Sequence, residues 1–284
     1  MRKRLSLDER RDRRRRAMQR SKFALPSAIT LISVLCGFSS VVMSLNAAGG
    51  SPRWYFTWAA GLLVLAGVFD GLDGRVARAT NTATEFGVQL DSLADVLSFG
   101  MAPAILAYRY GFFQLGMGDH NLRAVGWAAS FLFVACGALR LARFNVQVGT
   151  VDSRFFVGLP IPAGAACIAS VILAFPDVPE RPWQAYAFAA ELVLVGLMMV
   201  STLRFPSFKK VSRKPSVRFW TTLAFLFLLA LMLVFQRTFF LGFFAVYVTL
   251  GLALNLAWLL GWRGVAPPHP TRAPEAAGEE DGLA

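Results

Sequence analysis

The hydrophobic residues of this 284-residue chain gather into eight long runs, separated by polar breaks and by turns that contain Pro or Gly. A run of about 20 apolar residues forms a helix that can cross the hydrocarbon core of a bilayer. The first run, residues 27–47, corresponds to a helix about 31 Å long. The pattern therefore predicts an all-α integral membrane protein. Its expected spans are residues 27–47, 53–78, 86–109, 122–146, 158–175, 184–204, 217–235 and 239–262, all of comparable length.

These runs and the segments between them predict four parts of the chain. Residues 1–22 hold eleven Lys or Arg and are expected to form a basic cytoplasmic segment. Residues 23–205 form a six-helix membrane core, and residues 206–262 contain a cytoplasmic loop and two additional transmembrane helices. Residues 263–284, rich in Pro, Ala, Gly and acids, are expected to be a disordered cytoplasmic tail.

The distribution of basic residues predicts the orientation in the membrane. With the N-terminus inside, 24 of the 29 Lys and Arg residues lie on the cytoplasmic side, as the positive-inside rule requires. Both termini are therefore expected in the cytoplasm. The net charge of +12 comes from residues beside apolar helices, where anionic lipid explains it better than nucleic acid does. No nucleic-acid partner is expected.

Cysteine and histidine do not indicate a metal or disulfide framework. Cys36, Cys136 and Cys167 are isolated within apolar runs, where cysteine packs as a small hydrophobic residue. His120 and His269 lie too far along the chain from any cysteine to suggest a zinc site.

Four carboxylates lie at the ends of the second and third runs. Asp70 and Asp73 are three residues apart, and Asp91 and Asp95 are four apart, so each pair shares one helix face. Acids at such a depth usually mark a functional site. Carboxylate oxygens suit Mg²⁺ or Mn²⁺, and a pair of such ions is suited to phosphoryl transfer.

A purely structural role for these acids leaves charge unexplained. Arg75 and Arg78 could pair with them, but two bases against four acids leave a net negative cluster. Gly71, Gly74 and Gly87 remove side chains where the two helix ends face each other, which allows close approach of a backbone or a ligand. The pattern therefore favours a cation site.

The same stretch resembles the signature of the CDP-alcohol phosphotransferase family, D-x2-D-G-x2-A-R-x8-G-x3-D-x3-D. Every fixed position is met, at Asp70, Asp73, Gly74, Ala77, Arg78, Gly87, Asp91 and Asp95.

Three further stretches are similar to the bacterial type II phosphatidylserine synthases within that family. They begin at Asp91 (D-S-L-A-D-V-L-S-F-G-M-A-P-A), Ala138 (A-L-R-L-A-R-F-N-V) and Gly158 (G-L-P-I-P-A-G-A). The resemblance covers about residues 23–205. It implies a homodimeric enzyme of a bacterial cytoplasmic membrane that transfers the phosphatidyl group of CDP-diacylglycerol to L-serine and releases CMP.

The resemblance also implies roles for single residues. Asp70 and Asp91 would bridge two divalent ions, Mg²⁺ or Mn²⁺, while Asp73 and Asp95 would each ligate one of them. Asp95 would also accept the proton of the serine hydroxyl. The CDP-diacylglycerol head group would be held by Gly74, Ala77, Arg78, Thr84 and Thr30.

The serine site is a separate hypothesis. Arg140, Arg143 and Asn145 lie at the cytoplasmic end of the fourth run, where a guanidinium can bind a carboxylate or phosphate with two hydrogen bonds. The alternative is that the two arginines only anchor the helix at the membrane surface. Ser98 and the turn at residues 158–162 could shape the same pocket or simply pack.

Two other functions stay open at this point. The acceptor could be another alcohol, such as glycerol 3-phosphate, inositol phosphate or choline. A protein of a different class, a cation transporter, would also place carboxylates in a membrane, but it gives no reason for the Gly and Arg spacing. Glu191, the one acid inside the sixth run, is given no catalytic role.

Overall fold

The structure is a computed structural model in which residues 28–47, 52–80, 85–113, 115–147, 155–206 and 238–260 are described. The basic segment 1–22, the span expected at 217–235 and the tail 263–284 lie outside these ranges. Within them, six helices are long and apolar enough to cross a membrane. The prediction of an all-α, multi-pass membrane protein is therefore confirmed.

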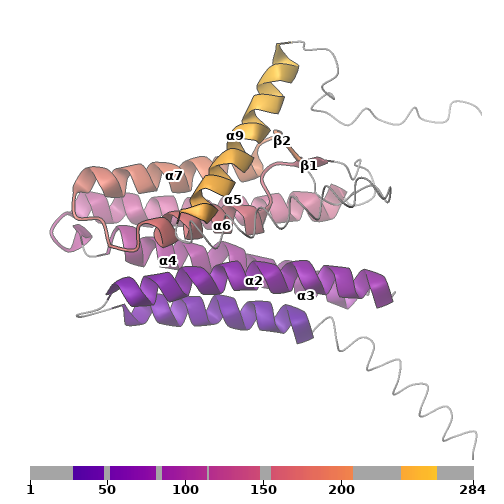
Figure 1. Ribbon diagram of the computed structural model, residues 1–284, viewed down its shortest axis with the longest axis horizontal. Coiled ribbons are helices and arrows are strands. Elements are labelled where there is room, and N and C mark those ends of the chain that lie inside the picture. The colour runs from indigo at the N-terminus through magenta and orange to yellow at the C-terminus, as the bar shows by residue number, and fades with distance from the viewer. Residues whose placement is uncertain are drawn as a thin grey trace, which may run out of the picture.

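The first helix spans Ala28–Asn46. It is followed by α2 (Pro52–Thr80), α3 (Glu85–Asp95), the π-helical segment η1 (Val96–Met101), α4 (Ala102–Gly111), the short 3₁₀ segment η2 (Leu115–Met117), α5 (His120–Gln147), β1 (Phe155–Val157), α6 (Ile161–Ala174), α7 (Pro182–Val200), β2 (Arg204–Pro206) and α9 (Phe239–Leu259). The helices α2, α5 and α7 run along the length of a bundle, and α9 crosses it at a steep angle (Figure 1).

Large apolar side chains cover the outside of the bundle. Leu35, Phe38, Phe131 and Leu194 are each more than half exposed. A soluble protein seldom leaves so much apolar surface in water, whereas a bilayer solvates it. The exposed faces of these helices are thus suited to contact with lipid chains.

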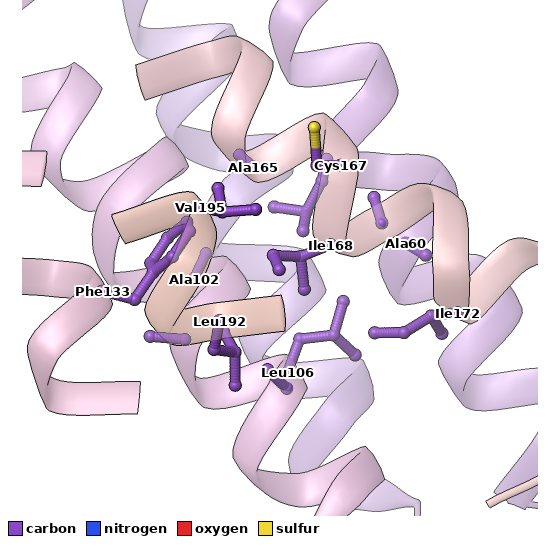
Figure 2. Packing of buried hydrophobic residues seen from close by; sticks show 14 of the residues in the cluster. Ala60, Ala102, Leu106, Phe133, Ala165, Cys167, Ile168, Ile172, Leu192 and Val195 are labelled. Carbon is purple, nitrogen blue, oxygen red and sulfur yellow. The ribbon is translucent and has the colours of Figure 1, made fainter. Parts of the chain in front are cut away.

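The core lies between α4, α5, α6 and α7. Figure 2 shows Ile168 of α6 near its centre, with Leu106 of α4 and Leu192 of α7 nearby and Phe133 of α5 at one side. All four side chains are fully buried. The helices α5 and α7 pack along each other, and α6 is in contact with α2, α4, α7 and α9.

The fifth expected span, residues 158–175, is shorter than predicted. Its helix, α6, covers 14 residues and is therefore about 21 Å long. The chain before it is a turn, because Gly158 has a φ of 77° and Leu159 donates its N–H to the carbonyl of Met198. The helix ends before Pro176, which begins the connection to α7. The expectation of comparable lengths was wrong here because this turn is tied to α7.

Two short strands hold the same region together. β1 and β2 pair antiparallel, with Phe156 opposite Phe205, and the Gly158 N–H donates to the carbonyl of Leu203. The pattern of apolar runs in the sequence did not predict these strands. They join the start of α6 to the segment that follows α7.

Replacement of Gly158 by Ala is expected to destabilise the protein by about 1–3 kcal/mol, because an L residue is strained at its positive φ. A Cβ there would also overlap the carbonyl oxygen of Met199. Gly61→Ala in α2 is the matched control, since a Cβ at that position meets no neighbouring atom within 4 Å. Thermal unfolding in detergent measures both variants. Equal melting temperatures for the two would contradict the role of the turn.

The third expected span contains a π-helical segment between α3 and α4. Pro103 lies at the start of α4 and has no N–H, so the regular α-helical hydrogen bond to the carbonyl of Phe99 cannot form. The N–H of Ala102 donates to the carbonyl of Leu97, five residues earlier. Ser98 is fully buried in this segment, and a Cβ on Gly37 of the first helix would lie 2.9 Å from its Cα. The first helix therefore packs backbone to backbone on η1.

Candidate functional site

Three of the four motif acids converge. Asp70 of α2 and Asp91 and Asp95 of α3 each place one carboxylate oxygen within 4.8 Å of those of the other two. All three are half-buried. Because α2 and α3 follow each other through a short connection, the end of one helix lies beside the start of the next (Figure 1).

The fourth acid, Asp73, is held by the first helix. It is 5% exposed, and its Oδ2 accepts a hydrogen bond of 2.8 Å from the hydroxyl of Thr30. The first helix is also tied to α2 through the hydroxyl of Ser33, which donates to the carbonyl of Ala66. Asp73 and Asp70 lie close enough for electrostatic interaction. Thr30, expected to contact substrate, is thus in contact with a motif acid.

Asp95 is the last residue of α3, directly before the π-helical segment. Its Oδ1 atom is buried and has no hydrogen-bond partner. A buried carboxylate oxygen without a partner is costly, and either a proton or a cation removes that cost. Asp95 belongs to the same group of acids as Asp70 and Asp91. This orphaned oxygen and the all-oxygen donor set fit a divalent ion such as Mg²⁺ or Mn²⁺.

Arg140 of α5 is a buried basic residue that interacts with the acid cluster. It is 6% exposed, it interacts electrostatically with Asp95, and its Nε atom is buried without a hydrogen-bond partner. Its Cζ atom lies 5.5 Å from the ring centroid of Phe144. Tyr247 of α9, itself buried, also interacts electrostatically with Arg140. No motif in the sequence indicated a link between α9 and the site.

Arg143 has a different environment from Arg140. Its guanidinium donates hydrogen bonds to the backbone carbonyls of Val200, Ser201 and Val157, at 2.9, 3.0 and 3.4 Å. These carbonyls lie at the end of α7 and on β1. Arg143 thereby connects α5 to both elements, a role that the sequence pattern did not reveal.

Asn145 links α5 to α3. Its Nδ2 donates a 3.0 Å hydrogen bond to the hydroxyl of Ser92, the residue after Asp91. Ser92 was not predicted from the sequence, because the hydroxyl of a helical serine commonly bonds to the carbonyl four residues earlier, as that of Ser92 also does with Val88. Ser98, by contrast, is buried against Gly37 of the first helix. The turn before α6 is hydrogen-bonded to α7. Both therefore make packing contacts between helices.

The expected nucleotide-binding positions are only partly described. Gly74 is half-buried within α2, and Ala77 and Arg78 belong to the same helix. The side chains of Ala77 and Arg78 and the whole of Thr84 lie outside the described part of the chain. At Gly71 a Cβ would meet no atom within 4 Å, so the space there is open and not filled by another helix.

Comparison with known proteins agrees with the motif. The family model of CDP-alcohol phosphatidyltransferase matches residues 23–200. A CDP-diacylglycerol–serine O-phosphatidyltransferase of Helicobacter pylori is 38% identical over 232 residues, which cover 79% of this chain and 89% of that protein. The protein of the same name from Methanocaldococcus jannaschii is 33% identical over 181 residues, covering 63% and 72%. An archaetidylserine synthase of Methanothermobacter thermautotrophicus is 34% identical over 188 residues, covering 66% and 71%.

Proposed function

Because the chain belongs to the CDP-alcohol phosphatidyltransferase family, we propose that it is a phosphatidylserine synthase. It would transfer the phosphatidyl group of CDP-diacylglycerol to the hydroxyl of L-serine and release CMP. The observation that carries the proposal is the convergence of Asp70, Asp91 and Asp95 at the position of the family motif. The names of the similar proteins from H. pylori and M. jannaschii support serine as the acceptor.

The four acids would hold two divalent ions, Mg²⁺ or Mn²⁺. Asp70 and Asp91 would contribute to both, Asp73 to one and Asp95 to the other. Bound ions neutralise the negative charge of the diphosphate and of the leaving CMP. The hydrogen bond from Thr30 orients Asp73 for this role.

Asp95 would accept the proton of the serine hydroxyl. The serine oxygen then forms a bond to the phosphorus of the phosphatidyl group, and the bond from that phosphorus to the CMP oxygen breaks. CMP leaves with the electron pair. Asp95 can fill both roles because a carboxylate has two oxygens, so one can ligate an ion while the other accepts the proton. Its Oδ1 supports this, since that buried oxygen is not engaged by a hydrogen-bond donor.

The CDP head group would lie against the end of α2. Gly74 and Ala77 leave room for the nucleotide, and Arg78, Thr84 and Thr30 are the polar candidates that hold it. The acyl chains would stay in the bilayer. The open space above Gly71 supports access from this side.

Arg140 is the stronger candidate of the two arginines for the serine carboxylate. Its Nε has no partner and it lies near Asp95, whereas Arg143 already donates three hydrogen bonds to backbone carbonyls. Asn145 would act through Ser92, next to Asp91.

Arg140→Gln is expected to raise the KM for serine about tenfold, the effect of losing one charge-assisted hydrogen bond. The KM for CDP-diacylglycerol should change less. Arg143→Gln is the comparison variant, expected mainly to lower the melting temperature because it frees three carbonyls. Steady-state kinetics with both substrates varied measure the effect. A serine KM that is unchanged in Arg140→Gln but raised in Arg143→Gln would reverse the assignment.

We further propose a homodimer in a bacterial cytoplasmic membrane, with both termini and the acid cluster on the cytoplasmic side. The excess of basic residues on that side supports the orientation. Serine and CDP-diacylglycerol would then meet at the cytoplasmic surface. Cysteine labelling of single-cysteine variants at the tail, in intact cells and in inverted vesicles, tests the orientation.

The proposed function is tested by CMP release from CDP-diacylglycerol by the purified protein. Release should require both L-serine and a divalent ion. Glycerol 3-phosphate, inositol phosphate and choline in place of serine test the alternative acceptors, and ion flux in proteoliposomes tests a transporter. Release with another alcohol but not with serine would overturn the choice of acceptor while keeping the chemistry.

A further inference from the structure

A cavity lies at the end of the bundle opposite the acid cluster. Its volume is about 690 Å³, within the range of pockets that hold small ligands. Residues of α2, α4, α6 and α7 line it, together with the connection between α6 and α7. Arg53 at its edge and Asp70 of the acid cluster are 17 residues apart on α2, which corresponds to about 26 Å. The cavity is therefore separate from the proposed active site.

Glu191 lines this cavity from within a membrane span. It follows the start of α7 at Pro182 by nine residues, which places it about 14 Å along the helix. Among the described residues, no hydrogen bond or ion pair engages its carboxyl group. An acid at this depth normally has a cationic partner or faces a polar path. Glu191 faces the cavity.

Arg53 is the basic residue among those that line the cavity, and it lies beside an acid of the α6–α7 connection. Arg53 lies 3.6 Å from Asp177, and their side chains are 50% and 72% exposed. Such an exposed ion pair is weak, so an incoming anion can compete for the guanidinium. The hydroxyl of Tyr110 donates to the carbonyls of Phe175 and Asp177 and so holds the α6–α7 connection in place.

Exposed aromatic side chains at the edge of the cavity are typical of the level of lipid head groups. Trp183 lines the cavity and is 62% exposed, and Phe175 beside it is 61% exposed. Tryptophan is enriched at the boundary between the bilayer and water. Val171, Ala174 and Ala187 line the cavity from the apolar helices, while Pro176 and Glu180 line it from the connection. The cavity is thus bordered by both lipid-facing and polar segments.

We propose that this cavity binds the head group of a zwitterionic aminophospholipid, with the ammonium directed toward Glu191 and the phosphate near Arg53. The order of the charges supports this ligand, since the acid lies deep and the arginine lies at the edge. The lining holds three acids, Asp177, Glu180 and Glu191, against Arg53, so a lipid with an ammonium group beside its phosphate fits it better than an anionic lipid does. A divalent ion is disfavoured because, among the described residues, the acids that converge at metal-ligand distances are Asp70, Asp91 and Asp95.

Calorimetric titration of the purified full chain in detergent tests the proposal. The probe is dihexanoyl phosphatidylethanolamine, and dihexanoyl phosphatidylglycerol and the N-acetylated form of the first lipid are the comparisons. The ethanolamine lipid should bind at one saturable site, and both comparison lipids should bind at least about tenfold more weakly, because each lacks the ammonium. Equal affinities for the three lipids would overturn the proposal.

Variants then locate the site. Glu191→Gln, nearly the same shape, should weaken binding about tenfold, and Arg53→Gln should weaken it several-fold. Arg123→Gln, at the same end of the bundle but outside the cavity, should leave it unchanged. Melting temperature and gel filtration show whether each variant is folded. If Glu191→Gln does not fold, the affinities of the natural chain for the three lipids decide whether the proposal holds. Unchanged affinity in a folded Glu191→Gln variant, or displacement of the lipid by Mg²⁺ alone, would rule out this binding mode.

Discussion

Asp95→Asn is expected to lower the kcat of serine-dependent CMP release by about a thousandfold or more, since a positioned general base contributes about 10²–10⁴. An amide cannot accept the proton of the serine hydroxyl, and it replaces one of three converging carboxylates. The substitution keeps the shape of the side chain, so the packing of η1 on the first helix should persist. CMP release at saturating concentrations of both substrates measures the effect.

The matched control for this variant is Asp119→Asn at the start of α5. The carboxylate of Asp119 accepts hydrogen bonds from the N–H groups of Asn121 and Leu122, and an asparagine caps a helix about as well. Its activity should stay within about twofold of the natural chain, because helix-cap exchanges of this kind change little. Binding of CDP-diacylglycerol should largely survive in Asp95→Asn. Retained turnover in Asp95→Asn would remove this residue as the base.

Removal of divalent ions should reduce CMP release by at least about a hundredfold, because such ions contribute several kcal/mol to charge stabilisation in this class of reaction. Mg²⁺ or Mn²⁺ should restore activity and Na⁺ or K⁺ should not. The physical reason is the group of three carboxylates on α2 and α3, which repel one another unless a cation or protons intervene. The measurement is CMP release after treatment with EDTA and dialysis.

A second measurement does not depend on activity. Electron paramagnetic resonance of Mn²⁺ reports the bound ion directly, and Asp70→Asn and Asp91→Asn should each raise the Mn²⁺ concentration needed for half occupancy. Asp119→Asn serves again as the control. Full activity after complete chelation, or Mn²⁺ binding that is the same in all three variants, would contradict the proposed metal site.

The positions of the motif acids were largely predictable from the sequence. A separation of four residues places Asp91 and Asp95 on one helix face, and the short connection between two apolar runs returns α3 alongside the end of α2. Their convergence with Asp70 follows from local periodicity and chain connectivity. The same reasoning placed Asp73 with them, but not its hydrogen bond to Thr30, which lies 43 residues earlier.

Contacts between distant residues could not be predicted in this way. Arg143 is bonded to carbonyls 14 to 58 residues away, and the short strands depend on a pairing of residues 155–157 with 204–206. A sequence pattern records that a residue is basic or apolar, not which backbone carbonyl lies within its reach. For the same reason the charge of Arg143 in the sequence indicates a substrate contact and does not reveal its three backbone partners.

The π-helical segment between Asp95 and Pro103 changes how the third span must be read. One extra residue in a helical turn shifts the phase of everything beyond it by about 100°. A helical wheel drawn from Asp91 and Asp95 therefore assigns the wrong face to Tyr110, near the far end of the same span. Side chains at the two ends of this span therefore point in directions that a single regular helix would not give. Alignments and designs that treat residues 86–111 as one regular helix will carry that offset from the end with the acid cluster to the other end.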